Sequence, residues 1–532
     1  MKLPIEEGFG TMSVASIIAE SAARRPDAAA LIVGEEVTTY GQLWDQTRAY
    51  AGALSARGVG AGDAVAVLIP NVADFARVYY AVLSLGGVVV PIHALLKAHE
   101  IEYVLRDSAA ALLVCAAPLM AEGAEGAAKA GVDVLTVLAS EGGDGAPRLE
   151  DEAKVATPVT SFVPRRPQDT ATILYTSGTT GQPKGALGTH LALLMQVQVL
   201  LISTFDVRDD DVLFGGLPLF HTFGQTCVLN VGLTAGATIV MCPRFTGDAA
   251  LDLLEKHGIT IFFGVPTMYI ALLEAAKNNP ARPELRYGIS GGASLPVAVL
   301  DKFREVFGSE IHEGYGLTET SPVASFNHVG KTPRAGTIGT AIWGVDIEVA
   351  RTETLDSIEL LPRGELGELV IRGHNLFKGY LNRPDATAEA VIDGWFRTGD
   401  LGIKDDDGYL RIVDRKKDMI IRNGYNVYPR EIEEIICQHP DVVSAAVFGV
   451  PHERHGEEVA AAVIATPGSM LTPTELSEYI RSRAASYKYP RIVNIVPELP
   501  MGPSGKILKR ELATEYLTAA SRQGSIPKGA AE

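Results

Sequence analysis

The chain has 532 residues, too many for one ordinary core, so at least two domains are expected. Hydrophobic residues make up 47% and charged residues 21%, which excludes an intrinsically disordered protein. The net charge of −17 argues against nucleic acid or an anionic membrane surface as the main partner, although a few basic groups can still form a local site for a small anion.

The N-terminal segment MKLPIEEGFG lacks the basic start and apolar core of a signal peptide. The apolar stretch 191–203 is short and contains glutamines, which favours a buried helix over a membrane span. We therefore expect a cytoplasmic protein with no membrane span and no nucleic-acid partner. The four cysteines form no close pair, and the PHERHG histidines lack HExxH spacing, so neither disulfides nor a zinc site is predicted.

Short strand-like runs alternate with helical patterns in the first part of the chain. The runs occupy 65–70, 87–92 and 110–116, and helical spacing is found at 74–85 and 100–107. The pattern resumes with a strand at 237–242, a helix at 248–257 and a strand at 259–266. Strands that alternate with helices predict parallel sheets covered by helices.

The pattern changes between residues 337 and 412. Short β-like pieces such as GELVIRG and YLRIVD are separated by Gly, Pro and Asp turns, which predicts a small barrel or antiparallel sheet. After the charged run 414–418 the mixture of helix and strand returns, so we place the domain boundary there: 1–416 and 417–532.

The segment 172–185 reads TILYTSGTTGQPKG, a strand-like run that enters a loop rich in Gly, Ser and Thr. Glycines let backbone N–H groups approach phosphate oxygens, hydroxyls add donors, and Lys184 adds a positive charge. Lys184 lies between Pro183 and Gly185, so the Walker A pattern fails, and the Rossmann GxGxxG pattern fails too. The alternative is a turn without a ligand, which this composition directly after a buried strand disfavours.

YTSGTTGQPKG resembles the signature loop of the adenylate-forming (AMP-binding) superfamily, which contains acyl-CoA synthetases, amino-acid adenylation domains and luciferases. The match continues in the expected order over nearly the whole chain, through TYGQL, LPLFHTFG, FGVPT, SGGASLP, EGYGLTET, WFRTGD, DRKKDMI, NGYNVYP and PSGKILKREL. With the sequence pattern, the resemblance predicts an α/β fold: two helix-covered sheet subdomains and a small β-barrel in a large N-terminal domain, then a small mobile α+β C-terminal domain.

The resemblance implies two steps that use ATP, Mg²⁺ and coenzyme A. The acid's carboxylate attacks the α-phosphate of ATP and releases pyrophosphate, and a thiol then attacks the acyl-adenylate. The first step brings a carboxylate to a polyanion, so it needs positive charge and a metal more than a general base.

The resemblance also assigns residues to roles. Lys506, Thr318 and Glu319 would be catalytic, and Glu319, with Thr176 as a second candidate, would hold Mg²⁺. Lys417 would be the hinge, and Gly424 and Tyr425 would line the path of the thiol. Tyr315 would stack on adenine, and Asp400 and Arg415 would bind the ribose. The full nucleotide-binding set is Thr176, Ser177, Gly178, Thr179, Thr180, Lys184, Gly292, Ala293, Ser294, Glu313, Gly314, Tyr315, Gly316, Thr318, Asp400, Arg415 and Lys506.

Two positions inform on the acid. His221 stands where amino-acid activators have an aspartate, and an ammonium buried without a carboxylate would be costly, so an amino acid is not expected. Gly316 stands where acetyl-CoA synthetases have a Trp, which implies a deeper pocket. The candidate acyl-pocket residues are His221 together with Phe223, Gly224, Val228, Phe263, Gly264, Val265, Ser290, Gly291 and Gly316. None of the residues beside His221 is basic, so a dicarboxylic acid would lack an obvious partner for its second carboxylate.

The prediction is an acyl-CoA synthetase, of the branch that contains fatty-acid–CoA ligases, acting on an apolar fatty, aryl or polycyclic monocarboxylic acid. Three alternatives share the motifs. They are a stand-alone adenylating enzyme that loads an acyl-carrier protein, a luciferase-like oxygenase, and an inactive fold used only for binding.

Overall fold

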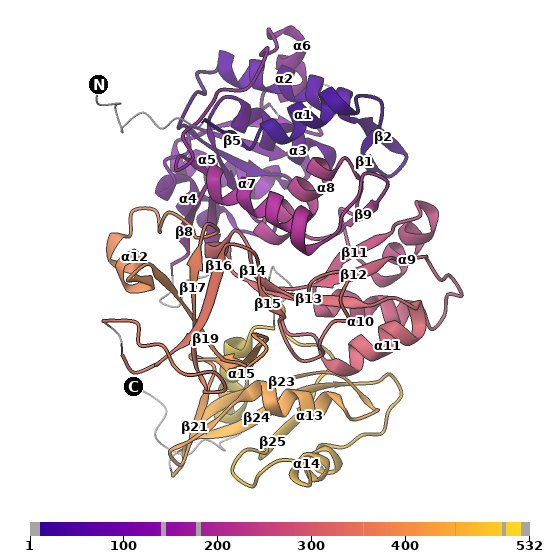
Figure 1. Ribbon diagram of the computed structural model, residues 1–532, viewed down its shortest axis with the longest axis vertical. Helices are drawn as coiled ribbons and strands as arrows, with labels where there is room; N and C mark the ends of the chain where they lie inside the picture. The colour runs from indigo at the N-terminus through magenta and orange to yellow at the C-terminus, as the bar shows by residue number, and fades with distance from the viewer. Residues whose placement is uncertain are drawn as a thin grey trace.

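The computed structural model describes residues 11–139, 145–176, 182–354, 356–452, 454–502 and 507–522. Figure 1 shows the N-terminal elements at one end of the molecule and the C-terminal elements at the other. The predicted α/β fold is confirmed: the described residues form four sheets, of which the first two are covered by helices.

The first sheet has six strands in the order β6-β5-β3-β4-β7-β8. Its strands β3, β4 and β5 are parallel and completely buried, and they are the three runs predicted as strands. The predicted helical segments form α3 and α4. The bounds are β3 Ala64–Leu68, α3 Ala73–Ser84, β4 Val88–Pro91, α4 Ala98–Asp107, β5 Leu112–Ala116, α5 Met120–Ala130, β6 Asp133–Val137, α6 Leu149–Val155, β7 Thr170–Thr176 and β8 Lys184–Thr189.

The second sheet has nine strands in the order β15-β14-β13-β12-β11-β9-β10-β1-β2. It contains the first two strands of the chain and seven strands from the middle of the chain. A reciprocal capping box between Thr39 and Gln42 fixes the start of the helix after β2. The strand bounds are β1 Ala29–Val33, β2 Glu36–Thr39, β9 Val212–Gly215, β10 Thr238–Met241, β11 Ile261–Gly264, β12 Tyr287–Ser290, β13 Ile311–Gly316, β14 Val323–Phe326 and β15 Thr340–Ala341.

The helices of this region include a π-helix, η3, which begins at Phe223, in the last two residues of the LPLFHTFG motif. Stretches of π-helix are rare and frequently lie at functional sites. The helix bounds are α1 Ser16–Arg24, α2 Tyr40–Ala56, α7 His190–Val199, η3 Phe223–Asn230, α8 Val231–Ala235, α9 Gly247–Lys256, α10 Pro266–Ala275, α11 Val297–Phe307 and the 3₁₀ turn η4 Thr318–Thr320.

The third sheet is antiparallel and corresponds to the predicted small barrel. Its strands pair in the order β16-β17-β19-β18, and β20 pairs with β19. The bounds are β16 Val345–Ala350, β17 Gly367–Gly373, α12 Pro384–Ala390, β18 Val391–Ile392, β19 Trp395–Lys404 and β20 Leu410–Arg415.

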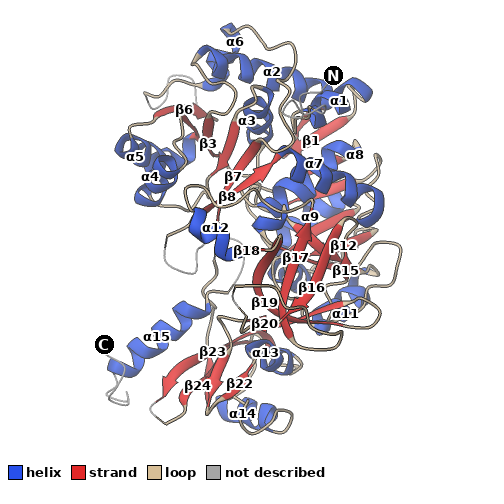
Figure 2. Ribbon diagram, turned by 60° about the vertical axis from the view of Figure 1, so that its left-hand side comes forward, coloured by secondary structure: helices blue, strands red, loops and turns tan. Residues whose placement is uncertain are grey.

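The fourth sheet belongs to the C-terminal part of the chain, with the order β22-β21-β24-β23 and β25 paired with β24. Figure 2 shows the long last helix, α15, beside this sheet. The bounds are β21 Ile420–Arg422, β22 Tyr425–Val427, α13 Pro429–Cys437, β23 Val442–His452, β24 Gly456–Ala465, α14 Pro473–Arg481, β25 Ile492–Ile495 and α15 Lys509–Arg522.

The turn 416–418 separates the third sheet from the fourth, and the exact domain boundary stays a prediction. Helix α13 contacts β20 across this junction, where the Arg430 N–H donates to the Asp414 carboxylate at 3.0 Å. Among the described residues, no helix has both the length and the hydrophobicity needed to cross a bilayer.

The PHERHG histidines lie next to a buried carboxylate. Ligand atoms of His452, His455 and Glu458 come within 4.8 Å of one another. However, the Arg422 guanidinium donates to both Glu458 oxygens, at 2.6 and 2.9 Å. The Arg422 guanidinium already neutralises this carboxylate and would repel a metal cation, so we assign no metal site here.

Candidate active site

The predicted phosphate loop begins and ends on two paired strands. Strands β7 and β8 are antiparallel, and their register places Thr176 opposite Lys184. The Lys184 Nζ lies 5.1 Å from the centroid of the Tyr380 ring. Ser177, Gly178, Thr179, Thr180 and the predicted catalytic Lys506 lie outside the described residues.

The predicted metal ligand Glu319 lies in the short turn η4, next to the half-buried Thr318. Its side chain is buried, and the Tyr380 hydroxyl donates to its Oε1 at 2.7 Å. Burial and the neighbouring Glu319 carboxylate raise the pKa of Tyr380, so the phenol stays protonated and donates. The structure thus brings Glu319 and Lys184 to the same tyrosine.

The three residues predicted to hold the nucleoside also meet. The Tyr315 hydroxyl donates to Asp400 Oδ2 at 2.6 Å, and the Arg415 Nε lies 3.3 Å from Asp400 Oδ1. Asp400 and Arg415 are cross-strand partners on β19 and β20. The side chain of Asp400 is buried, so its carboxylate is held in place by these two neighbours.

The loop after β12 carries Gly292, Ala293 and Ser294, which are exposed. Glu313 lies on the adjacent strand β13 and accepts from the Leu295 N–H at 3.2 Å, which ties the loop's end to the strand. Burial raises the pKa of Glu313 to about 7. At Gly314 an added Cβ would lie 2.5 Å from the Phe326 ring, so the packing here leaves no room for a side chain unless that ring moves.

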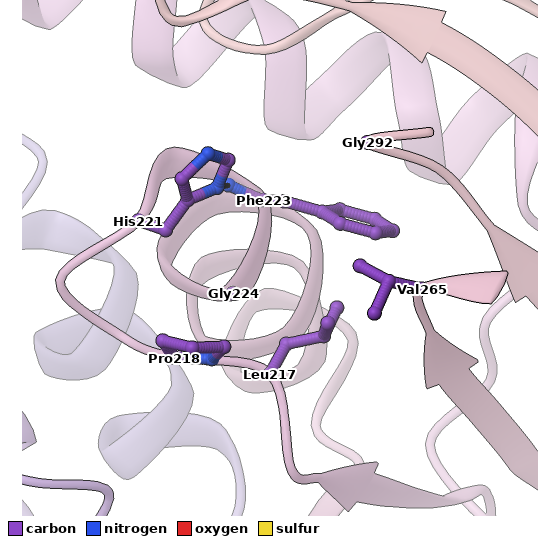
Figure 3. A pocket seen from close by; sticks show the side chains of 7 residues that line it. All are labelled: Leu217, Pro218, His221, Phe223, Gly224, Val265 and Gly292. Carbon is purple, nitrogen blue, oxygen red and sulfur yellow. Dashed lines mark hydrogen bonds between the residues drawn. The ribbon is translucent and has the colours of Figure 1, made fainter. Parts of the chain in front are cut away.

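A small apolar cavity lies at the start of η3, as Figure 3 shows. The Phe223 ring and the Val265 side chain point toward each other, and the His221 Nδ1 accepts from the Phe223 N–H at 3.2 Å. The cavity holds about 20 Å³, room for roughly one water, so an acyl group would have to displace side chains to enter. Its lining is Leu217, Pro218, His221, Phe223, Gly224, Val265 and Gly292.

Four of the predicted acyl-pocket residues, namely His221, Phe223, Gly224 and Val265, line this cavity. Gly291 lies next to it, because a Cβ there would be 3.3 Å from the Phe223 ring. The remaining predicted residues do not line it. They are Val228, Phe263, Gly264, Ser290 and Gly316.

The structure gives Gly316 a different explanation from the one predicted. A Cβ at this position would lie 1.7 Å from the Pro322 carbonyl oxygen and 2.7 Å from its carbonyl carbon, on the chain that returns as β14. The pairing of β13 with β14 is irregular between Tyr315 and Gly316. Because the absent side chain would point at backbone, close packing by itself accounts for a glycine here. That Gly316 also opens a deeper acyl pocket stays a prediction.

Sequence reasoning missed two residues that organise the site, Tyr380 and Asn71. The buried Asn71 amide donates to the carbonyl of Leu217 at 2.7 Å, and its Oδ1 accepts from the Leu219 N–H at 3.0 Å. Asn71, which follows a strand of the first sheet, thereby fixes the backbone at Leu217 and Leu219 beside the cavity. Asn71 could have been predicted from its position just beyond the end of β3, since ligand sites gather at the carboxyl ends of parallel strands. No sequence pattern indicated Tyr380.

The predicted hinge and thiol-path residues lie in the C-terminal part of the chain. Lys417 is in the turn 416–418, where the Asp418 N–H donates to the Arg415 carbonyl at 3.0 Å. Gly424 lies in the exposed β21–β22 turn, and the exposed Tyr425 begins β22. The Tyr425 ring packs on Tyr487 with centroids 4.9 Å apart. Their roles in the reaction stay predictions.

The chain matches known proteins over nearly its whole length. Residues 18–381 match the family model of the AMP-binding enzyme, and residues 431–506 match that of the AMP-binding enzyme C-terminal domain. The chain belongs to the AMP-binding enzyme family. As predicted, this AMP-binding enzyme is an acid–CoA ligase of the AMP-forming type, which activates a carboxylic acid with ATP.

Curated relatives and a solved structure agree with this assignment. The ligase is 34% identical to the long-chain-fatty-acid–CoA ligase of Bacillus subtilis, covering 96% of both chains. It is 36% identical to a feruloyl-CoA synthase of an Amycolatopsis species, covering 92% of this chain and 96% of the relative. The structure of ATP-bound MatB from Rhodopseudomonas palustris is 34% identical, with a TM-score of 0.87 over 95% of this chain and 99% of that chain.

Proposed function

We propose that this acid–CoA ligase activates an apolar monocarboxylic acid, with a fatty, aryl or polycyclic acyl group. The observation that carries the proposal is the lining of the cavity at η3, which contains no acidic or basic side chain other than the His221 imidazole. A second carboxylate would be buried there without a cationic partner, which is costly. Relatives named for a fatty acid and for ferulate support the same class.

An acid panel tests this proposal. Pyrophosphate release is measured with ATP and fatty, aryl and dicarboxylic acids, each with and without coenzyme A. Fatty or aryl monocarboxylates should give the highest rates, and coenzyme A should convert the adenylate to a thioester. A dicarboxylic acid that reacts faster than every monocarboxylic acid of similar length would contradict the proposal.

The donor set near the phosphate loop fits Mg²⁺. Glu319 and Thr176 offer a carboxylate and a hydroxyl, the hard oxygen ligands that this ion prefers, and Lys184 supplies a positive charge on the same side. When bound, the ion would neutralise charge on the phosphates as pyrophosphate leaves. Thr318, in the same short turn as Glu319, would donate to the α-phosphate.

The ribose would bind at Asp400 and Arg415, with adenine between Tyr315 and the exposed loop of Gly292, Ala293 and Ser294. The support for this proposal is the meeting of Tyr315, Asp400 and Arg415 at hydrogen-bonding and ion-pair distances. In such a complex the Tyr315 hydroxyl would share the Asp400 carboxylate with the ribose hydroxyls. The nucleoside would thus be positioned by β13, β19 and β20 together.

A proline at the predicted hinge should separate the two half-reactions. Proline fixes φ and also restricts the preceding residue, so Lys417→Pro would impede a rotation about the turn 416–418. We expect thioester formation from supplied acyl-adenylate to slow at least about tenfold more than adenylation does. Lys417→Ala keeps a freely rotating backbone and is the matched control. If both half-reactions of the proline variant match those of the control, the pivot lies elsewhere.

A further inference from the structure

The segment 377–381 joins two parts of the proposed triphosphate site through its backbone. It runs beside β8, where the Lys378 N–H donates to the Leu187 carbonyl at 2.8 Å and the Leu381 N–H donates to the Gly185 carbonyl at 2.8 Å. At its other end the Phe377 N–H donates to the backbone carbonyl of Glu319 at 2.8 Å. The segment therefore connects the strand that carries Lys184 to the turn that carries Glu319.

The Tyr380 side chain makes the same connection at the level of functional groups. Its hydroxyl donates to Glu319 Oε1 at 2.7 Å, and its ring lies under the Lys184 ammonium, 5.1 Å from Nζ to the centroid. The ring itself is fixed by an edge contact with Phe377, with centroids 4.8 Å apart. One rigid aromatic side chain thus sets the positions of an anionic and a cationic group.

We propose that Tyr380 is a positioning residue for ATP: its hydroxyl orients the Glu319 carboxylate toward the metal, and its ring supports Lys184. This inference rests on the proposed roles of Glu319 and Lys184. A carboxylate that binds a metal is held by its own hydrogen bonds, and losing such a partner typically weakens metal affinity tenfold or more. A cation over an aromatic face is attracted to the ring independently of the hydroxyl.

Two substitutions separate the two contributions. Tyr380→Phe removes the hydroxyl and keeps the ring under Lys184, whereas Tyr380→Leu removes both. ATP binding is measured by calorimetry without any acid substrate, once with Mg²⁺ and once with a chelator. We expect Tyr380→Phe to weaken ATP binding about tenfold in Mg²⁺ and little in the chelator. Tyr380→Leu should weaken binding in both buffers.

Tyr409→Phe is the matched control, because Tyr409 is half-buried and its ring carries Arg334 at 4.9 Å in a similar way. It should bind ATP like the parent in both buffers. Thermal melting of Tyr380→Phe should stay close to that of the parent, which separates a positioning role from a purely structural one.

The variant Glu319→Gln tests the metal-binding role of Glu319 separately from the positioning role of Tyr380. If Glu319→Gln loses Mg²⁺-dependent ATP affinity and Tyr380→Phe does not, the positioning role of Tyr380 is overturned and the metal role of Glu319 stands. If Glu319→Gln binds ATP in Mg²⁺ like the parent, the metal role is wrong and the inference falls with it. Parallel losses in Tyr380→Phe and Glu319→Gln, confined to Mg²⁺, support both.

Discussion

Replacing Gly316 by alanine is expected to slow adenylation of short and long acids alike by about a hundredfold or more. The added Cβ would overlap the Pro322 carbonyl, 1.7 Å from its oxygen and 2.7 Å from its carbon. Both are backbone atoms, so no side-chain rotation can relieve the overlap. Strand β13 or the returning chain must therefore shift, and Tyr315 is the adjacent residue on β13. A displacement of about 1 Å in a positioning element can cost about a hundredfold in rate, so we expect at least that loss.

The measurement is pyrophosphate release with a two-carbon acid and with a long or bulky acid. Gly60→Ala is the control, because a Cβ at Gly60 has only the Asp63 carboxylate within 4 Å, at 3.8 Å. The informative comparison is Gly316→Trp. If this variant kept the short acid and rejected the long one, Gly316 would be a pocket wall after all, and the backbone explanation would be wrong.

Lys506→Ala should slow acyl-adenylate formation by about a hundredfold or more, the loss typical of one preorganised electrostatic donor. The proposed role of Lys506 is to bridge the acid's carboxylate and the α-phosphate while negative charge gathers between them. Thioester formation from supplied acyl-adenylate should be much less affected, because no phosphate is attacked in that step. The two half-reactions are measured separately, as pyrophosphate release and as AMP release from a supplied acyl-adenylate.

Arg510→Ala is the matched control for charge. Arg510 is exposed at the start of α15, four residues after Lys506 in the sequence, so this variant also removes one positive charge from the same part of the chain. It should keep both half-reactions close to the parent. Equal losses in both steps for Lys506→Ala, or a similar loss for Arg510→Ala, would show that Lys506 has no specific role in adenylation.

The sequence determined the layered fold and the kind of chemistry. Runs such as 65–70 and 110–116 are apolar throughout, and such runs become buried parallel strands because both of their faces are covered. GELVIRG lies between turns and forms β17 over the residues expected. These signals are local, since each depends on the spacing of residues within one element, and the ordered motifs identified the enzyme family in the same way.

Only the tertiary structure decided which distant groups meet and which positions tolerate a side chain. Tyr315 reaches Asp400, Tyr380 reaches Glu319, and Asn71 reaches the loop at Leu217, each across a large separation in sequence. The close packing of Gly316 could not be predicted, because it comes from the carbonyl of Pro322 on the returning chain. Periodicity and motif spacing describe one segment at a time, whereas these contacts depend on how separate segments pack together in three dimensions.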